Sequence, residues 1–289
     1  MAQVGKAVAH GAVTVINAIS CGFGAALGVD LKTEATVRLT NEPGMIEGRI
    51  LSDPAESTML MKKVVGRVLG HHNLQDEYGA FVETRSNIPI ARGLKSSSVA
   101  ANAITLASLS ALGGNVDDLV AVNLGVDGAM DAKVTITGAF DDACASYFGG
   151  LVVTDNYQRE ILHCSEVEDY AVMIYAPAGK AYTSRSNIEG MRRIAREVKA
   201  IHKLALSGDY WVAMTINGIL YSTVLGFDPS IALEALSAGA IAAGLSGTGP
   251  AVAAVVSKDH VEGVRDAWLK HGREIIQTNV NHEKACLLR

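Results

Sequence analysis

The sequence PIARGLKSSSVAA, residues 89–101, decides how this chain is interpreted, because it joins a glycine-bearing loop to a segment rich in small residues. Ser96, Ser97 and Ser98 precede alanines that continue to about Leu112, so we expect a helix to begin at the serines. The first N–H groups of a helix have no partner within it and lie at the positive end of its dipole, which suits phosphate binding. An ordinary loop and helix cap is the simpler interpretation when the stretch is taken alone.

Two further stretches are rich in glycine or acid. Leu245–Pro250, LSGTGP, allows the backbone to approach a ligand closely, or forms a tight turn between a helix and a strand. Asp141 and Asp142 lie among small residues ahead of Gly149 and Gly150. A carboxylate in such a setting can accept a proton from an attacking hydroxyl or hold a cation, whereas acids also favour helix N-termini for structural reasons. The residues alone leave both interpretations open.

The composition excludes several classes of protein. Of the 289 residues 49% are hydrophobic, which is enough to build a large core and excludes disorder as the main state. The 25 Lys and Arg are outnumbered by 30 Asp and Glu, so nucleic acid is not an expected partner. Polar residues interrupt every long apolar stretch, and we expect no membrane span. Four scattered cysteines fit a reducing, cytoplasmic location.

Apolar patterns predict a chain that mixes α and β structure. Alternating residues predict a strand over Lys32–Leu39, and an apolar stripe at helical spacing predicts a helix over Ser57–Leu69. In the second half, helices are expected over Ile188–Leu206 and Pro229–Ala243. Because the regular order of a doubly wound sheet is missing, we predict the α+β class. A boundary near Asn156 divides the chain into expected domains 1–156 and 157–289.

Three segments, in this order, resemble the motifs of the GHMP kinase superfamily. Gly5–Gly11 is similar to the first motif, Pro89–Ala101 to the phosphate loop, and Leu245–Pro250 to the glycine-rich third motif. Within the superfamily, His10–Thr14 and Gly138–Ala143 most resemble the archaeal-type shikimate kinases, as does the GLKSSS of the phosphate loop. Three ordered matches are far more specific than one, and the resemblance extends through essentially the whole chain.

This resemblance implies a two-lobed α+β fold with the active site between the lobes. It also implies ATP-dependent phosphorylation of the shikimate 3-hydroxyl to give shikimate 3-phosphate and ADP, in the route to chorismate and aromatic amino acids. ATP and Mg²⁺ are then the expected cofactor set, shikimate the expected small-molecule partner, and a monomer or homodimer the expected assembly. Lys95 replaces the glycine usual in the wider superfamily, which would place a positive charge beside the phosphates.

The resemblance also carries site residues onto this chain. The expected nucleotide-binding residues are Pro89, Ile90, Ala91, Arg92, Gly93, Leu94, Lys95, Ser96, Ser97, Ser98, Gly247 and Gly249. The expected acceptor-binding residues are Thr14, Asn17, Asp141, Arg185 and Asn187, since shikimate carries one carboxylate and three hydroxyl groups.

Asp142 occupies the place of the catalytic aspartate, and Lys6 that of the first-motif lysine that pairs with it in such relatives. A neighbouring cation lowers the pKa of a carboxyl group and stabilises a transferring phosphoryl group. Ser97 is the expected Mg²⁺ ligand, with Asp131 as a second one. A surface acid on a helix is an equally good interpretation of Asp131.

Two alternatives remain at this point. Another small-molecule alcohol kinase of the superfamily, above all a homoserine kinase, would keep all three motifs but would need an acidic pocket for the ammonium group of its acceptor. A catalytically silent member would act as a ligand sensor or structural partner and would keep only the glycine loops. The coexistence of Lys6, Ser97 and Asp142 favours an enzyme.

Overall fold

The long strand β2, Phe23–Thr40, organises the N-terminal sheet of the computed structural model, which describes residues 3–179 and 187–289. It pairs antiparallel with β1 over most of its length. Its later half also pairs with β4, and its first residues pair with β5. Apolar residues alternate along the later half, and Ala35, Val37 and Leu39 are buried, as the sequence pattern predicts. One strand thus reaches from the outer edge of the molecule to its centre.

The remaining strands complete this sheet in the order β11-β1-β2-β4-β3, with the β5–β6 hairpin attached to β2. Their bounds are β1 Val4–Ile16, β3 Ile46–Ile50, β4 Gly79–Ser86, β5 Leu151–Asp155, β6 Glu160–Ser165 and β11 Cys286–Leu287. Only β3 and β4 run parallel to each other among these pairs. The last strand brings the C-terminal end of the chain back to the first sheet.

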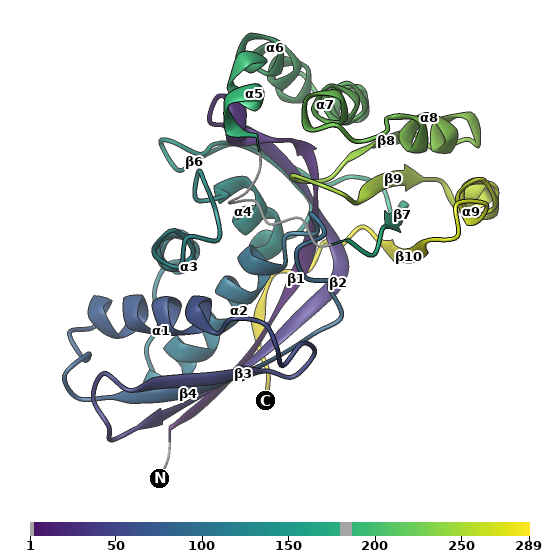
Figure 1. Cartoon of the computed structure of the whole chain (residues 1–289). Coiled ribbons are helices and arrows are strands. Elements are labelled where there is room, and N and C mark those ends of the chain that lie inside the picture. Colours follow the sequence, from purple (N-terminus) through teal and green to yellow (C-terminus); the bar gives the residue numbers. More distant parts are fainter. Residues whose placement is uncertain (1–2, 180–186) are drawn as a thin grey trace.

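Four helices accompany the N-terminal sheet (Figure 1). They are α1 Met59–His71, α2 Ser96–Leu112, α3 Asp118–Asp131 and α4 Phe140–Phe148. Helices α1, α2 and α4 pack against its strands, and α3 packs on these three helices. Helix α2 is apolar or small on nearly every side, as expected of a helix enclosed by its neighbours, and it packs on β1, β2, α1, α3 and α4. It ends at Gly113, whose left-handed conformation allows a tight C-terminal turn.

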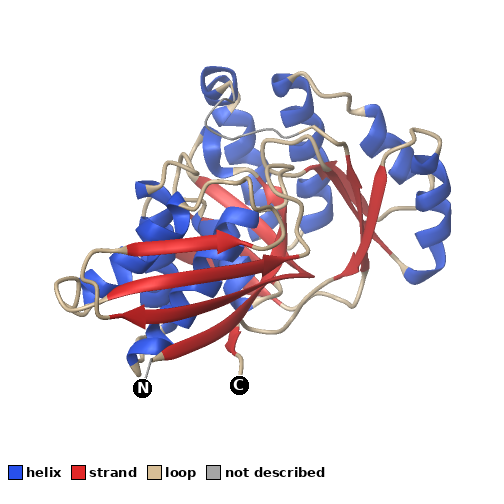
Figure 2. Cartoon of the chain, turned by 60° about the horizontal axis from the view of Figure 1, so that its bottom comes forward, coloured by secondary structure: helices blue, strands red, loops and turns tan. Residues whose placement is uncertain are grey.

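The second half of the chain forms a four-stranded antiparallel sheet in the order β10-β7-β9-β8. These strands are β7 Ala171–Ala176, β8 Ala242–Leu245, β9 Val252–Val256 and β10 Glu274–Asn279. The helices that accompany them are α5 Ile188–Arg193, α6 Ala195–Leu206, α7 Tyr210–Leu225, α8 Ser230–Ser237 and α9 Val261–Leu269. Figure 2 shows the two sheets side by side, each with its own helices.

The two halves share one buried core, because α7 packs against both β8 and β1. The predicted boundary near Asn156 falls in the turn between β5 and β6, which are neighbours in the N-terminal sheet. The second sheet begins only at β7. The predicted α+β class is confirmed, and in the part of the chain that the structure describes no helix is long and apolar enough to cross a membrane.

Two predicted helices are corrected. The helix expected over Pro229–Ala243 stops at Ser237, because the chain turns at Gly239 with φ of 98° and then enters strand β8. The helix expected over Ile188–Leu206 is divided into α5 and α6 at Ile194. The predicted helix from Ser96 to Leu112 is confirmed.

Candidate active site

Helix α2 begins without a side-chain cap. The residue before its first turn is Lys95, which has φ of 62° and forms no capping hydrogen bond. The serines predicted to cap the helix instead make up its first turn, and Leu94 is buried beneath them. The first N–H groups of α2 are therefore left for a ligand, at the positive end of the helix dipole.

These N–H groups face a cavity of about 390 Å³. It is lined by the start of α2 and the loop before it, by the 3-10 helix after β1, and by residues of β2, β3 and β4. The segment between β3 and α1, the start of α1, the segment between α3 and α4, the start of α4 and the third glycine-rich turn complete the lining. Its polar and charged lining includes Asn17, Thr33, Ser52, Glu56, Ser57, Thr84, Ser86, Lys95, Ser96, Ser97, Ser98, Lys133, Thr135, Thr137, Asp141, Asp142 and Thr248. A cavity of this size holds a small ligand of nucleotide class.

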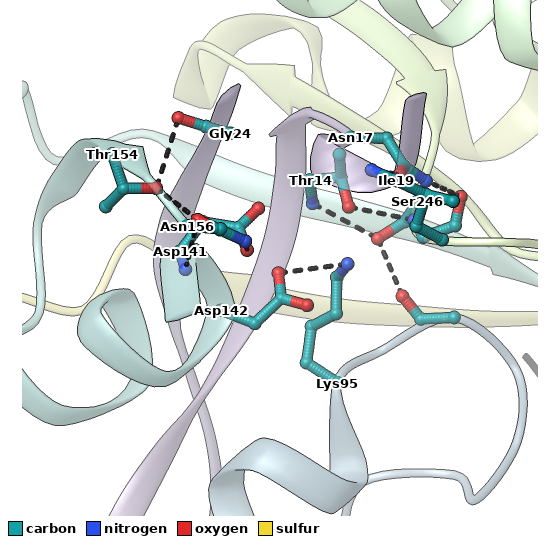
Figure 3. Close-up of polar contacts among 12 residues, drawn as sticks. Thr14, Asn17, Ile19, Gly24, Lys95, Asp141, Asp142, Thr154, Asn156 and Ser246 are labelled. Atoms are coloured by element: carbon teal, nitrogen blue, oxygen red, sulfur yellow. Dashed lines mark hydrogen bonds and ion pairs between the residues drawn. The ribbon is translucent and has the colours of Figure 1, made fainter. Parts of the chain in front are cut away.

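The phosphate-loop segment and the third glycine-rich segment, far apart in sequence, are joined by Ser246. Its hydroxyl donates to the carbonyl oxygen of Gly93 at 2.8 Å and accepts the N–H of Thr14 at 3.2 Å (Figure 3). The N–H of Ala251 donates to the carbonyl of Arg92 at 3.1 Å. Gly93 has φ of 84°, and a side chain there would collide with the carbonyl oxygen of Ser246. The glycine is thus required by both the turn and the contact.

The peptide of Gly247 is held on both sides by the end of β1. Its N–H donates to the hydroxyl of Thr14 at 2.8 Å, and its carbonyl accepts from the amide of Asn17 at 2.8 Å. Asn17 also accepts the N–H of Ile19 and so starts the 3-10 helix Ala18–Ser20. The first and third motifs therefore form one buried polar junction beneath the phosphate loop.

A buried ion pair lies where helices α2 and α4 begin. The Nζ of Lys95 is 3.0 Å from Oδ1 of Asp142, and each side chain is only 9% exposed. Burial and the neighbouring Asp141 raise the pKa of Asp142 to about 7, while Lys95 opposes them. A carboxyl group with this pKa exchanges a proton readily at neutral pH, which is what a proton acceptor in catalysis needs.

Asp141 is oriented by a network from the β5–β6 hairpin. The amide of Asn156 donates to Oδ1 of Asp141 at 2.7 Å, and its own oxygen accepts the N–H of Asp141 at 3.2 Å. The hydroxyl of Thr154 donates to the same amide oxygen at 2.7 Å. Sequence reasoning missed Asn156, since a single polar residue after a strand carries no signal of this contact.

The structure brings most of the sequence-predicted residues to one cavity. Those that line it are Asn17, Ile90, Ala91, Gly93, Lys95, Ser96, Ser97, Ser98, Asp141, Asp142 and Gly247. Sequence reasoning did not single out Lys133, Thr248 or Glu56, which line it as well. Thr248 lies within the quoted LSGTGP stretch, of which only the glycines were predicted as ligands. Lys133 and Glu56 are isolated residues in loops and belong to no pattern that could have pointed to them.

Several predicted residues lie elsewhere. Arg92 does not line the cavity and forms an ion pair with Glu274 of β10 at 2.7 Å, and its binding of the nucleotide stays a prediction. The hydroxyl of Thr14 accepts the N–H of Gly247, and the amide oxygen of Asn187 accepts the N–H of Gly190 at the start of α5. Neither residue lines the cavity, and their contacts with the acceptor stay predictions. Arg185 lies outside the described residues.

Three more predicted nucleotide ligands do not line the cavity. Leu94 is part of the core. Pro89 lies in the loop beside the cavity-lining Ile90. A side chain at Gly249 would meet the ring of Phe227. These residues lie in or beside the glycine-bearing loops, and their contact with a nucleotide stays a prediction.

Two predicted charges are also corrected. Lys6 is exposed near the start of β1, whereas the opposite end of this strand reaches the cavity, so Lys95 takes the place beside Asp142 that was predicted for Lys6. Both carboxylate oxygens of Asp131 are bound by Arg67, at 2.6 and 2.8 Å. This pairing lowers the pKa of Asp131 and leaves it on the surface as a structural partner.

The donor set suits a magnesium ion that is held mainly by phosphate oxygens. The hydroxyl of Ser97 in the first turn of α2 is one suitable oxygen ligand beside the phosphate-binding N–H groups. Within residues 3–179 and 187–289, no cluster of three or more His, Cys, Asp or Glu forms a complete metal cage. Mg²⁺ in phosphate sites commonly keeps water and phosphate ligands, so these residues fit it.

Comparisons with known proteins agree with this geometry. Residues 59–150 match the family model "GHMP kinases N terminal domain", and residues 223–274 match "GHMP kinases C terminal". The chain belongs to the GHMP kinase family. It is 46% identical to a protein named shikimate kinase from Methanosarcina mazei, over 99% of this chain and 97% of that protein. It is 41% identical to a shikimate kinase from Halobacterium salinarum, over 95% of this chain and 96% of that protein.

Solved structures of this family have the same fold. A homoserine kinase from Cytophaga hutchinsonii superimposes with a TM-score of 0.77 at 18% identity, covering 99% of this chain and 98% of that chain. The mevalonate kinase of Methanococcus jannaschii gives a TM-score of 0.75 at 16% identity, covering 97% and 99%. At such identities the likeness establishes the fold alone.

Proposed function

We propose that this GHMP kinase transfers the γ-phosphoryl group of ATP to the 3-hydroxyl of shikimate, giving shikimate 3-phosphate and ADP. Relatives that are 37–46% identical over nearly the whole chain carry the name shikimate kinase. The observation that carries the proposal within the site is the buried Lys95–Asp142 pair beside the uncapped start of α2. A carboxylate and an ammonium group thus lie next to a helix start that has no side-chain cap, and this arrangement supports the proposal.

ATP is proposed to bind with its phosphates at the start of α2. The free N–H groups of Ser96, Ser97 and Ser98 and the helix dipole would bind the phosphate oxygens. Gly93 and Gly247 allow the backbone to come close. Mg²⁺ bound through Ser97 and the phosphates would neutralise part of the negative charge on the transferring group.

Asp142 is the proposed proton acceptor. The oxygen on C3 of shikimate attacks the γ-phosphorus, the bond from that phosphorus to the β–γ bridging oxygen breaks, and the hydroxyl proton passes to Asp142. Lys95 stabilises the charge that gathers on the equatorial oxygens and keeps Asp142 in place. Positioning and charge stabilisation supply most of the catalysis in phosphoryl transfer, so the proton acceptor contributes only part of it.

The acceptor is proposed to lie between Asn17, Asp141 and Asp142. Arg185 stays the predicted partner of its carboxylate, because a guanidinium group binds a carboxylate through two parallel hydrogen bonds. The cytoplasmic location and the monomeric or homodimeric state likewise stay predictions from the sequence.

A direct assay tests the proposal. The purified full chain is incubated with ATP and Mg²⁺ and with shikimate, homoserine or mevalonate in separate reactions. ADP release is measured, and the product is identified by mass. Turnover with shikimate in preference to the other two acceptors is expected. Turnover with homoserine alone would agree with the family and refute shikimate as the acceptor. A folded protein that releases no ADP with any of the three acceptors would refute a kinase activity on these alcohols.

A further inference from the structure

The carboxylate of Asp141 is bound by protein on one side only. It lies in the first turn of α4, is 3% exposed and lines the cavity next to Asp142. Its Oδ1 accepts the amide of Asn156 at 2.7 Å. Among residues 3–179 and 187–289, no hydrogen-bond donor is found for its Oδ2. A nearly buried carboxylate oxygen in a ligand cavity calls for a donor from the ligand.

The orientation of Asn156 is fixed by two donors. Its amide oxygen accepts the hydroxyl of Thr154 at 2.7 Å and the N–H of Asp141 at 3.2 Å, so its NH₂ group must face the Asp141 carboxylate. Asn156 is itself 3% exposed. Figure 3 shows the chain of contacts from Gly24 through Thr154 and Asn156 to Asp141. A rotated amide would set like groups against each other, and the network therefore allows one arrangement.

Gly24 of strand β2 lies next to Oδ2 of Asp141, and because it has no side chain it leaves space beside this oxygen. A side chain at Gly24 would lie within 2.5 Å of Asp141 Oδ2 and 2.7 Å of its Cγ. The carboxylate thus lies between the backbone of β2 and the β5–β6 hairpin, with little room to turn. Lys95 is paired with Asp142 and leaves Asp141 to other partners.

We propose that Asn156 is a positioning residue, which holds Asp141 so that its second oxygen accepts a hydrogen bond from a hydroxyl next to the one that is phosphorylated. The proposal rests on the proposed function. Asp141 and Asp142 are consecutive residues of one helical turn and line one cavity, so two neighbouring hydroxyl groups of one acceptor match them. In shikimate the carbon next to C3 that bears a hydroxyl is C4. Asp141 then accepts a hydrogen bond from the 4-hydroxyl, while Asp142 takes the proton of the 3-hydroxyl.

This arrangement selects against acceptors that have a single hydroxyl. Such a molecule would leave Asp141 buried without a donor, and enzymes whose sites are built around a substrate hydroxyl reject analogues that lack it more strongly than apolar pockets reject a missing methylene. Homoserine has one hydroxyl group. The fixed Asp141 is therefore a specificity determinant within a family that shares the fold.

The test compares two acceptors and three proteins. Wild type, Asn156→Ala and the matched control Gln158→Ala are assayed with shikimate and with 4-deoxyshikimate. Gln158 is exposed in the same hairpin. Wild type is expected to prefer shikimate in kcat/KM. In Asn156→Ala, kcat/KM for shikimate should fall about tenfold to a hundredfold, the range for a hydrogen bond to a charged group. In this variant the kcat/KM for 4-deoxyshikimate and the KM for ATP should change little, so the preference for shikimate is lost. Gln158→Ala should behave as wild type.

Other results would overturn the inference. If wild type has the same kcat/KM for both acceptors, Asp141 does not recognise the 4-hydroxyl. An equal loss on both acceptors in Asn156→Ala would make Asn156 merely structural. If Asn156→Ala does not fold, Thr154→Val removes the hydroxyl that orients the amide, and an unchanged preference in that variant would refute the proposal. Wild type that phosphorylates homoserine but not shikimate would instead refute the proposed function.

Discussion

The Nζ of Lys95 lies 3.0 Å from Oδ1 of Asp142, and this contact joins the starts of two helices. Helix α2 follows Lys95 and α4 follows Ala139, and both preceding residues have a left-handed backbone, with φ of 62° and 49°. Neither helix has a side-chain cap. Two positive helix ends and the Lys95 ammonium group therefore lie beside the carboxylates of Asp141 and Asp142 in the cavity. This arrangement suits the transfer of an anionic group between a donor and an alcohol.

The two lysines give a first prediction. Lys95→Met should lower kcat by about 10²- to 10³-fold, because a donor aimed at developing charge in a dry site contributes this much. Lys6→Met is the matched control and should leave kcat near wild type, since Lys6 is exposed near the far end of β1. Steady-state kinetics with ATP and shikimate measure both. A large loss in Lys6→Met with normal turnover in Lys95→Met would restore the pairing predicted from the sequence.

Asp142→Asn should lower kcat by about 10²- to 10⁴-fold, the usual contribution of a positioned proton acceptor, while nucleotide binding survives. The amide keeps the size of the side chain but cannot take a proton at neutral pH. Binding of a non-hydrolysable ATP analogue, measured by calorimetry, separates the two effects. Asp131→Asn is the control, and we expect normal turnover with at most about 1 kcal/mol of lost stability, because its pair with Arg67 is largely exposed. Normal turnover in Asp142→Asn would exclude it as the acceptor.

The parts of this site that were predictable have two different bases. Helix α2 follows from local chemistry, since small helix-forming residues continue from Ser96 to Leu112. The phosphate loop was predicted from the family resemblance, because the stretch taken alone is more simply an ordinary loop and helix cap. The partner of Asp142 does not follow in the same way. Lys6 lies in β1 and Lys95 directly precedes α2, and only the path of β1 decides which of them reaches the cavity.

Buried polar networks were beyond prediction for the same reason. The contact between Asn156 and Asp141 depends on how the β5–β6 hairpin attaches to β2, which neither residue encodes locally. The first two residues of β8, Ala242 and Ala243, were predicted as the end of a helix, because alanine suits both states. They become part of a strand through pairing with β9, a contact that a local pattern does not contain.

Magnesium dependence gives a further prediction. Ser97→Ala should raise the Mg²⁺ concentration needed for half-maximal rate, because it removes a hydroxyl ligand from the phosphate-binding turn. Chelation of Mg²⁺ should abolish turnover of the wild type. Ser110→Ala, on the last turns of the same helix, is the matched control and should keep the wild-type Mg²⁺ requirement. An unchanged Mg²⁺ titration in Ser97→Ala would exclude this hydroxyl as a ligand.

The contact between the two glycine-rich loops is tested by glycine substitution. Gly93→Ala should raise the KM for ATP and lower the melting temperature, since a Cβ there strains the turn and collides with Ser246. Gly66 offers the opposite case, because it lies within α1 and a Cβ there meets no atom within 4 Å. Gly66→Ala should stabilise the protein by about 0.5–1 kcal/mol without changing kinetics. Calorimetry measures the melting temperature and ATP titrations measure the KM of both variants. If Gly93→Ala changes neither quantity, the loop can shift away from Ser246 without cost, and the contact between the two loops is not required.

The dependence of activity on pH follows from the raised pKa of Asp142. Since the proton acceptor must be charged, kcat/KM should fall with a slope of one as the pH drops below about 7. Lys95 lowers this pKa, so in Lys95→Met the residual activity should fall off at a higher pH. The residual activity of Asp142→Asn should not show this fall at low pH. A wild-type profile that stays flat from pH 8 to pH 5 would contradict the role of Asp142.

Stability should depend on pH in the opposite sense to activity. The pKa of Asp142 is about 7 in the folded protein and near its ordinary value of 3.8 in the unfolded chain, so the folded state holds the proton more tightly. This residue's contribution is therefore complete below about pH 4 and is lost as the pH rises through 7. Chemical unfolding at pH 5 and pH 8 should show a smaller pH dependence in Asp142→Asn than in wild type. An equal dependence in both proteins would mean that Asp142 titrates at an ordinary value, and that the buried pair with Lys95 stays ionised throughout this range.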